Sequence, residues 1–284
     1  MERTRGFMSD LHLMNGLSLH YYTDYRRSAT EFDEKDWFAV LKGAHYMDEL
    51  ITRHSAIMDQ HDPGGEVGLV VDEWGTWYNV ESGTHPRFLY QQNSLRDALV
   101  AALHLHIFNA HNDRVRMANI AQTINVLQSV ILTDGKKMIL TPTYHVFEMF
   151  KVHQDATRLA IDLRATDYSF EDQVIPGVSA SASRNAEGLV HLTLCNTNPN
   201  KPVDLACELR GLEVASIAGR ILTADLMTAH NTFDEPDRVK PVEFAGAMIE
   251  GEAMNIALPA MSVVALELQV PELDLTGTQR HEDG

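Results

Sequence analysis

The sequence contains little cysteine and no long apolar run. Its two cysteines, Cys195 and Cys207, do not form a CxxC motif, and so few thiols exclude a disulfide scaffold. We expect both to be small buried side chains in paired strands. No stretch reaches the roughly 18 uninterrupted apolar residues of a transmembrane helix, and Met1–Asp10 lacks the apolar core of a secretory signal. These absences predict a cytoplasmic protein with no membrane partner.

Basic residues are also scarce. The 284 residues include 23 Lys and Arg against 40 Asp and Glu, a net charge of −17. Binding to nucleic acid needs clustered cationic charge, so we expect a neutral partner and no nucleic acid. The sequence has no HExxH, no GxSxG and no glycine-rich phosphate loop, which argues against a metalloprotease, a serine esterase or a nucleotide enzyme. We therefore expect neither metal nor cofactor.

Strand and helix patterns alternate in residues 1–155. Apolar runs predict strands, and helical spacing or a capping pair such as Ser94 with Asp97 predicts helices between them. The strands are expected at 17–22, 67–71 and 114–118, and the helices at 34–60, from 94 onward, and at 143–153. This alternation is typical of a parallel α/β sheet or barrel, and the pattern alone does not separate the two. His104 and His106 alternate on the second helix and so make a poor metal site.

The pattern changes near residue 156. Short alternating runs at 189–194, 203–209, 216–222 and 262–268 are separated by turn residues, above all Asn196–Asn200. This predicts a β-sandwich over residues 156–270. The polar segment 271–284 is expected to be a flexible tail.

Polar residues gather where the predicted strands end. His20 stands beside Tyr22 after the first strand, and Glu73 stands near Trp77 after the second. In a parallel α/β barrel the loops at these strand ends form the pocket. A carboxylate among aromatic rings suits sugar chemistry, because rings pack on sugar C–H faces and the carboxylate can attack an oxocarbenium-like carbon. Alternatively, Glu73 caps a helix or pairs with an arginine, and the rings only pack.

Four separated motifs together resemble one family. They are Ser18-Leu19-His20-Tyr21-Tyr22, Asp72-Glu73-Trp74-Gly75-Thr76-Trp77-Tyr78, Ala121-Gln122-Thr123-Ile124-Asn125-Val126 and His230-Asn231-Thr232-Phe233-Asp234-Glu235-Pro236-Asp237-Arg238-Val239. In this order they resemble the C-terminal part of the α-L-arabinofuranosidases of glycoside hydrolase family 51. The resemblance runs from about Gly16 to Leu268.

The resemblance implies roles for individual residues. Glu73 would be the nucleophile of a retaining mechanism. His20 and Tyr22 would line the sugar subsite, with Tyr22 orienting the nucleophile. Trp77 would wall the pocket, and Gln122 would be a hydrogen-bond partner of the sugar. No cofactor is implied, and family members commonly form homo-oligomers.

One required group is missing. A retaining glycosidase needs a second carboxyl group about 5–5.5 Å from the nucleophile to act as acid and base. In the family this is the Glu of an Asn-Glu pair, and the sequence contains no Asn-Glu dipeptide. A complete barrel also needs about 250 residues. We therefore expect the C-terminal portion of a (β/α)8 barrel, about strands six to eight, from a truncated or split enzyme whose partner chain would hold the N-terminal half.

The expected activity is hydrolysis of terminal non-reducing α-L-arabinofuranosyl groups on oligosaccharides from arabinoxylan or arabinan. Two alternatives stay open at this point. The chain by itself is a catalytically silent fragment that binds carbohydrate or assembles with a subunit, or it belongs to another retaining glycosidase with the same barrel and sandwich layout.

Overall fold

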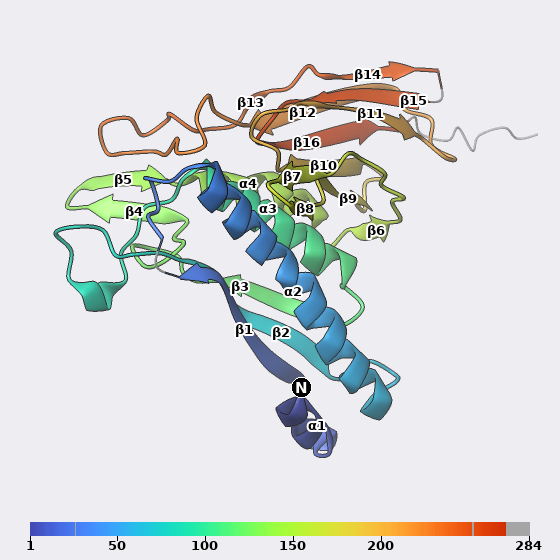
Figure 1. Cartoon of the computed structure of the whole chain (residues 1–284). Helices are drawn as coiled ribbons and strands as arrows, with labels where there is room; N and C mark the ends of the chain where they lie inside the picture. The colour runs from blue at the N-terminus through green and yellow to red at the C-terminus, as the bar shows by residue number, and fades with distance from the viewer. Residues whose placement is uncertain (26, 252, 271–284) are drawn as a thin grey trace, which may run out of the picture.

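A parallel sheet with helices on one side forms the first part of the molecule. The structure, a computed structural model, describes residues 1–25, 27–251 and 253–270, so the predicted tail at 271–284 lies outside the described residues. Strands β1 (Gly16–Tyr25), β2 (Gly68–Trp77) and β3 (Val115–Ile120) pair in parallel with β2 in the middle (Figure 1). All three strands were predicted, and each ends later in the chain than predicted, at residues 25, 77 and 120.

Two helices cover one face of this sheet, and a third packs on the second of them and on the sandwich. The helix α2 (Glu34–His61) begins where the Asp33 carboxylate accepts a hydrogen bond from the Asp36 backbone. The helix α3 (Leu95–Ala110) begins at the predicted capping box, in which Asp97 accepts a 2.8 Å hydrogen bond from the Ser94 N–H. The third predicted helix is divided into α4 (Pro142–Phe150) and a 3₁₀ turn η3 (Lys151–His153).

The second part is a β-sandwich, shown at the top of Figure 1. Among the described residues one sheet has the order β13-β12-β16-β10-β9-β6, and the other has the order β11-β15-β14. The predicted strand at 216–222 is β12, and the other three predicted runs correspond to β10, β11 and β16 within two residues. The predicted organisation, α/β followed by all-β, is therefore confirmed, and the boundary at residue 155 stays a prediction.

The remaining elements complete the two parts. Their bounds are α1 (Glu2–Met8), η1 (Leu11–Leu13), η2 (Pro86–Phe88), β4 (Ile131–Asp134), β5 (Lys137–Leu140), β6 (Thr157–Leu159), β7 (Tyr168–Phe170), β8 (Gln173–Ile175), β9 (Val178–Arg184), β10 (Val190–Asn196), β11 (Val203–Glu208), β12 (Ser216–Leu222), β13 (Val242–Glu243), β14 (Ala247–Glu250), β15 (Ala253–Leu258) and β16 (Ser262–Gln269).

Both cysteines lie in strands, but only Cys195 is fully buried, Cys207 is half-buried, and their two strands do not pair with each other. Cys195 is on β10 and Cys207 is on β11, and these strands belong to opposite sheets. The chain crosses from one sheet to the other between them, a connection that the strand pattern does not reveal. Both thiols are free, and burial raises the pKa of each.

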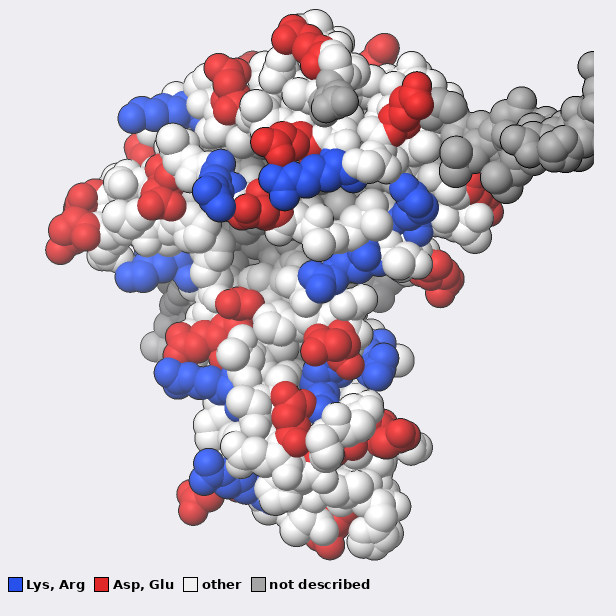
Figure 2. Space-filling model, turned by 90° about the vertical axis from the view of Figure 1, so that its right-hand side faces the viewer, with Lys and Arg blue, Asp and Glu red and all other residues white. Residues whose placement is uncertain are grey.

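Charged side chains of both signs lie on the surface. Figure 2 shows Lys and Arg side chains interspersed with Asp and Glu on the face that it draws. Within the described residues, no helix is both long enough and apolar enough to cross a bilayer.

One core spans both parts. Val71 of β2, Leu99 of α3 and Val263 of β16 belong to the same buried cluster. The indole N–H of Trp37 on α2 also donates a 2.9 Å hydrogen bond to the carbonyl of Thr197, just after β10. The sandwich therefore packs directly on the helices that support the parallel sheet.

Two histidines lie in this interface. His106 on α3 has Nδ1 2.8 Å from Ser179 Oγ and Nε2 3.0 Å from Thr193 Oγ1. His153 on η3 has Nδ1 2.7 Å from Ser183 Oγ and Nε2 2.8 Å from Thr193 Oγ1. Burial, and then the charge of a neighbouring histidine, lowers the pKa of His106 to about 3 and of His153 to about 4.

Lowering the pH is expected to weaken this interface. Because the folded-state pKa of each histidine lies below its unfolded value, the unfolded chain binds more protons as the pH falls below about 6.5. The contribution of each neutral histidine to the free energy of unfolding is therefore complete above pH 6.5. It is lost as the pH falls toward 4, by up to about 1.4 kcal/mol per pH unit for each histidine. Urea unfolding between pH 7 and pH 4.5 measures this slope. His106→Asn should reduce this slope of unfolding free energy against pH, whereas His12→Asn, at an exposed position, should leave it unchanged. Equal slopes in the unchanged protein and both variants would contradict a neutral buried His106.

Candidate active site

The site lies where β1 and β2 end. The register pairs Ser18 with Val70 and then His20 with Glu73, so β2 contains one more residue than β1 between these pairs. Such a bulge changes the direction of side chains along the strand. As a result, the consecutive residues Asp72 and Glu73 both contact His20.

His20 joins the two carboxylates. Its Nε2 lies 3.0 Å from Asp72 Oδ1, and its Nδ1 lies 3.0 Å from Glu73 Oε2. The Ser18 hydroxyl donates a 2.7 Å hydrogen bond to the same Asp72 oxygen. The imidazole is half-exposed and Glu73 is one-third exposed, so a molecule from solvent can reach this carboxylate.

Tyr22 holds the other oxygen of Glu73. The buried Tyr22 side chain donates its hydroxyl hydrogen to Glu73 Oε1. Its ring meets Trp77 edge-on, with ring centroids 4.9 Å apart. The structure thus brings together His20, Tyr22, Glu73 and Trp77. The partners described for Glu73 are a histidine and a tyrosine, and both of its oxygens are restrained.

Gln122 lies nearby but outside this network. It follows β3, and the N–H of the preceding Ala121 donates a 2.8 Å hydrogen bond to the Trp74 carbonyl. Ala121 packs in the small cluster that contains Tyr22. The Gln122 side chain is exposed and forms no hydrogen bond with any of the described residues.

Sequence reasoning missed the residues that support the site. Gln128 accepts a 2.9 Å hydrogen bond from the Thr76 N–H and donates one of 2.8 Å to the Asp97 carbonyl. The Thr76 hydroxyl donates to the Asp97 carboxylate at 2.7 Å, and burial raises the pKa of this carboxyl. Gln128 lies in an irregular segment after β3 that has no periodic pattern. The one signal in the sequence is Gly75, in the middle of the second motif, because a glycine there indicates an unusual backbone conformation.

The predicted separation of His104 and His106 is confirmed. His104 Nε2 lies 3.2 Å from the Ala44 carbonyl on α2, whereas His106 faces the sandwich, so the two histidines point to different sides as predicted. Across the described parts of the chain, no group of three or more His, Cys, Asp or Glu side chains is arranged to hold a metal ion.

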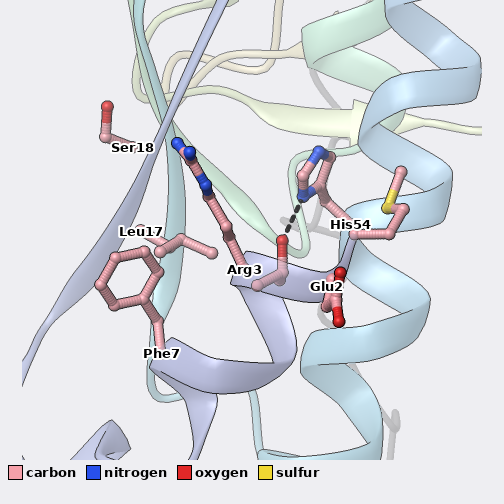
Figure 3. A pocket seen from close by; sticks show the side chains of 8 residues that line it. Glu2, Arg3, Phe7, Leu17, Ser18 and His54 are labelled. Atoms are coloured by element: carbon pink, nitrogen blue, oxygen red, sulfur yellow. Dashed lines mark hydrogen bonds between the residues drawn. The ribbon is translucent and has the colours of Figure 1, made fainter.

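A separate cavity lies near the start of β1. Its volume is about 500 Å³, and side chains from α1, β1 and α2 form its walls (Figure 3). Inside it the Thr4 hydroxyl lies 2.8 Å from Nδ1 of His54. Glu73 does not line this cavity, but Ser18, whose hydroxyl binds Asp72, does.

The fold and this site are typical of one class. A restrained carboxylate at the carboxyl end of a parallel strand, beside aromatic rings, is an arrangement that glycoside hydrolases use. A sequence model of the α-L-arabinofuranosidase C-terminal domain matches residues 72–262. The chain therefore belongs to this family of α-L-arabinofuranosidases, as the four sequence motifs predicted.

Individual relatives agree with this assignment. The chain is 45% identical to an intracellular exo-α-L-arabinofuranosidase of Bacteroides ovatus over 91% of its own length and 51% of the relative's. The crystal structure of a family 51 arabinofuranosidase from Xanthomonas axonopodis pv. citri is 49% identical, with a TM-score of 0.93 over 94% of this chain and 56% of that one. A family 51 structure from Bifidobacterium longum shares the fold at 22% identity and a TM-score of 0.79. The chain thus spans about half the length of these relatives.

Gly75 gives a test of how tightly the site is built. Its φ of +149° disfavours any residue with a Cβ, and an added Cβ would lie 3.2 Å from Gln128 Oε1. Gly75→Ala should therefore lower the free energy of unfolding by about 1–3 kcal/mol. The matched control is Gly64→Ala, where nothing lies closer than 4.0 Å to the added Cβ. Urea unfolding compares the two, and an equal effect would show that the backbone at Gly75 is not constrained.

Proposed function

We propose that the protein is a retaining exo-α-L-arabinofuranosidase that releases terminal non-reducing α-L-arabinofuranosyl groups from arabinoxylan or arabinan oligosaccharides. The observation that supports this most is the Glu73 carboxylate, held by Tyr22 on one oxygen and by His20 on the other. Two relatives, from Bacteroides ovatus and Streptomyces lividans, are named as exo-acting arabinofuranosidases, which agrees with the proposal.

Glu73 is the proposed nucleophile. One of its oxygens forms a bond to the anomeric carbon of the sugar while the bond to the leaving oxygen breaks, and water later releases the sugar from the enzyme. The hydrogen bond from Tyr22 and the contact with His20 hold the carboxylate in one position, so the carboxylate is already oriented when the sugar arrives. The Trp77 ring is proposed to wall the pocket, and the exposed Gln122 amide to bind a sugar hydroxyl.

The proposed acid/base comes from outside these 284 residues. The carboxylate nearest to Glu73 along the chain, Asp72, is engaged by Ser18 and His20. We propose that a longer form of the enzyme, or a partner chain with the N-terminal half, supplies the second carboxyl group. Assembly into a homo-oligomer and a cytoplasmic location are part of the same proposal, and several relatives are named intracellular.

Replacing Glu73 tests the nucleophile. In an assembled enzyme that contains the acid/base, Glu73→Ala should lower the turnover of an aryl α-L-arabinofuranoside by about 10⁴-fold or more, because the covalent step is lost. Added azide should restore part of the turnover by attacking the sugar in place of the carboxylate. Glu31→Ala, at an exposed position, is the matched control. If Glu73→Ala keeps the activity of the control, Glu73 is not the nucleophile.

A second candidate is a catalytically silent chain that binds carbohydrate or assembles with another subunit. The supporting observation is the parallel sheet, in which β1 and β3 each pair only with β2 among the described strands. Unpaired strand edges are ready to pair with another chain.

Assaying the purified 284-residue chain separates the two candidates. Without an acid/base to protonate the leaving group, we expect its turnover of an alkyl arabinofuranoside, which needs that proton, to be about 10²–10⁴-fold below that of the assembled enzyme. Adding a polypeptide with the missing carboxyl group should restore it. Full turnover by the chain alone would exclude the silent candidate.

A further inference from the structure

Arg96 is an arginine buried in the first turn of α3. Its side chain is 0% exposed, although an arginine is seldom fully buried unless its charge has a partner. Its Nη2 donates a 2.8 Å hydrogen bond to the carbonyl of Ser28. Its Nε and Nη1 are buried as well, and neither forms a hydrogen bond with the residues that the structure describes. The buried charge therefore needs contacts of another kind.

Two aromatic rings provide these contacts. The guanidinium carbon of Arg96 lies 3.6 Å from the ring centroid of Phe32 and 4.5 Å from that of Tyr78. The negative face of an aromatic ring attracts a cation, and it does so more strongly where water is excluded. A planar guanidinium can stack on rings and donate hydrogen bonds at the same time. Arg96 thus joins a ring from the loop before α2 to a ring that follows β2 directly.

The loop between β1 and α2 is attached to α3 by this arginine. Within residues 27–33 the Ser28 hydroxyl accepts hydrogen bonds from the N–H groups of Thr30 and Glu31, at 3.3 and 2.9 Å, so this part of the loop forms a compact turn. The hydrogen bond from Arg96 to the Ser28 carbonyl connects the turn to the helix. In a fold of this kind the loops that follow parallel strands form the pocket.

The segment after β2 is connected to the same loop. The Asn79 N–H donates a 2.9 Å hydrogen bond to the Arg27 carbonyl. Tyr78, whose ring contacts the guanidinium, directly follows Trp77 in the chain. Arg96 therefore reaches the backbone around Trp77 by two routes, through the Tyr78 ring and through the loop after β1.

We propose that Arg96 is a positioning residue for the sugar subsite. It fixes the loop after β1 and the Tyr78 ring, and through them it holds Trp77 in the place where this ring would wall the pocket. The inference rests on the proposed function. Because Glu73 is held separately by its own partners, loss of the guanidinium should weaken sugar binding more than it slows the chemical step.

Indole signals of the 15N-labelled 284-residue chain test the positioning. The chain has three tryptophans, and Trp77→Phe identifies the signal of Trp77. Arg96→Lys keeps the charge, but a lysine cannot cover two rings and reach Ser28 at once, so the Trp77 signal should shift. The signal of Trp37, whose N–H donates to the Thr197 carbonyl, should stay in place. An unmoved Trp77 signal would overturn the proposal.

Kinetics of the assembled enzyme relate this positioning to sugar binding. Arg96→Lys should raise the KM of an aryl α-L-arabinofuranoside about tenfold and change kcat by less than about twofold, because a wall of the subsite moves while the nucleophile does not. Phe32→Leu removes one ring, leaves the arginine in place and should raise KM by about threefold, so it also tests the idea if the lysine variant does not fold. Arg53→Ala is the matched control, since Arg53 is 58% exposed on α2. A KM equal to that of the control, or a lower kcat at constant KM, would show that Arg96 does not position the subsite.

Chemical rescue separates a missing guanidinium from a damaged fold. Guanidinium chloride at millimolar concentration should occupy the space left in Arg96→Ala, return the Trp77 signal toward its original position and lower KM again, whereas sodium chloride at the same concentration should not. Equal effects of the two salts would contradict the proposal. If Glu73→Ala leaves turnover unchanged while the Trp77 signal still depends on Arg96, the proposed function fails and the placement of Trp77 by Arg96 stands.

Discussion

Burial of Trp74 determines how the site is built. Its fully buried indole lies among His104 and Phe108 of α3 and stacks on Phe147 of α4, with ring centroids 6.0 Å apart in the last pair. Neighbouring residues of a strand point to opposite faces. With Trp74 committed to the helices, Glu73 must emerge on the other face, toward His20 and Tyr22.

The sandwich helps to fix the position of β2, although it acts through the helices that lie between them. It packs on α2 and α3, through Trp37 and His106, and these helices in turn cover the sheet. Interiors of this density transmit displacement, so a shift of the sandwich would move the strand that holds Glu73. The second part of the chain therefore supports the structure of the site, although none of the described partners of Glu73 comes from it.

Buried polar residues behind Glu73 fix the backbone at the end of β2. Gln128, Thr76 and Asp97 form a buried network in which each hydrogen bond fixes the next. Beside this network, Gly75 gives the backbone a φ of +149°, a conformation that residues with a Cβ disfavour. The carboxylate is thus held by its own two partners and by the backbone that follows it.

Several features followed from the sequence by itself, because they depend on local patterns. Helical spacing and the Ser94–Asp97 capping pair located the helices, and continuous apolar runs located the parallel strands. Four separated motifs, taken together and in order, indicated the family. Contacts between distant segments leave no such pattern. The bulge that turns both Asp72 and Glu73 toward His20, the separation of Cys195 and Cys207 into two sheets, and the pairing of Gln128 with Thr76 all depend on how remote residues pack, so only the tertiary structure decided them.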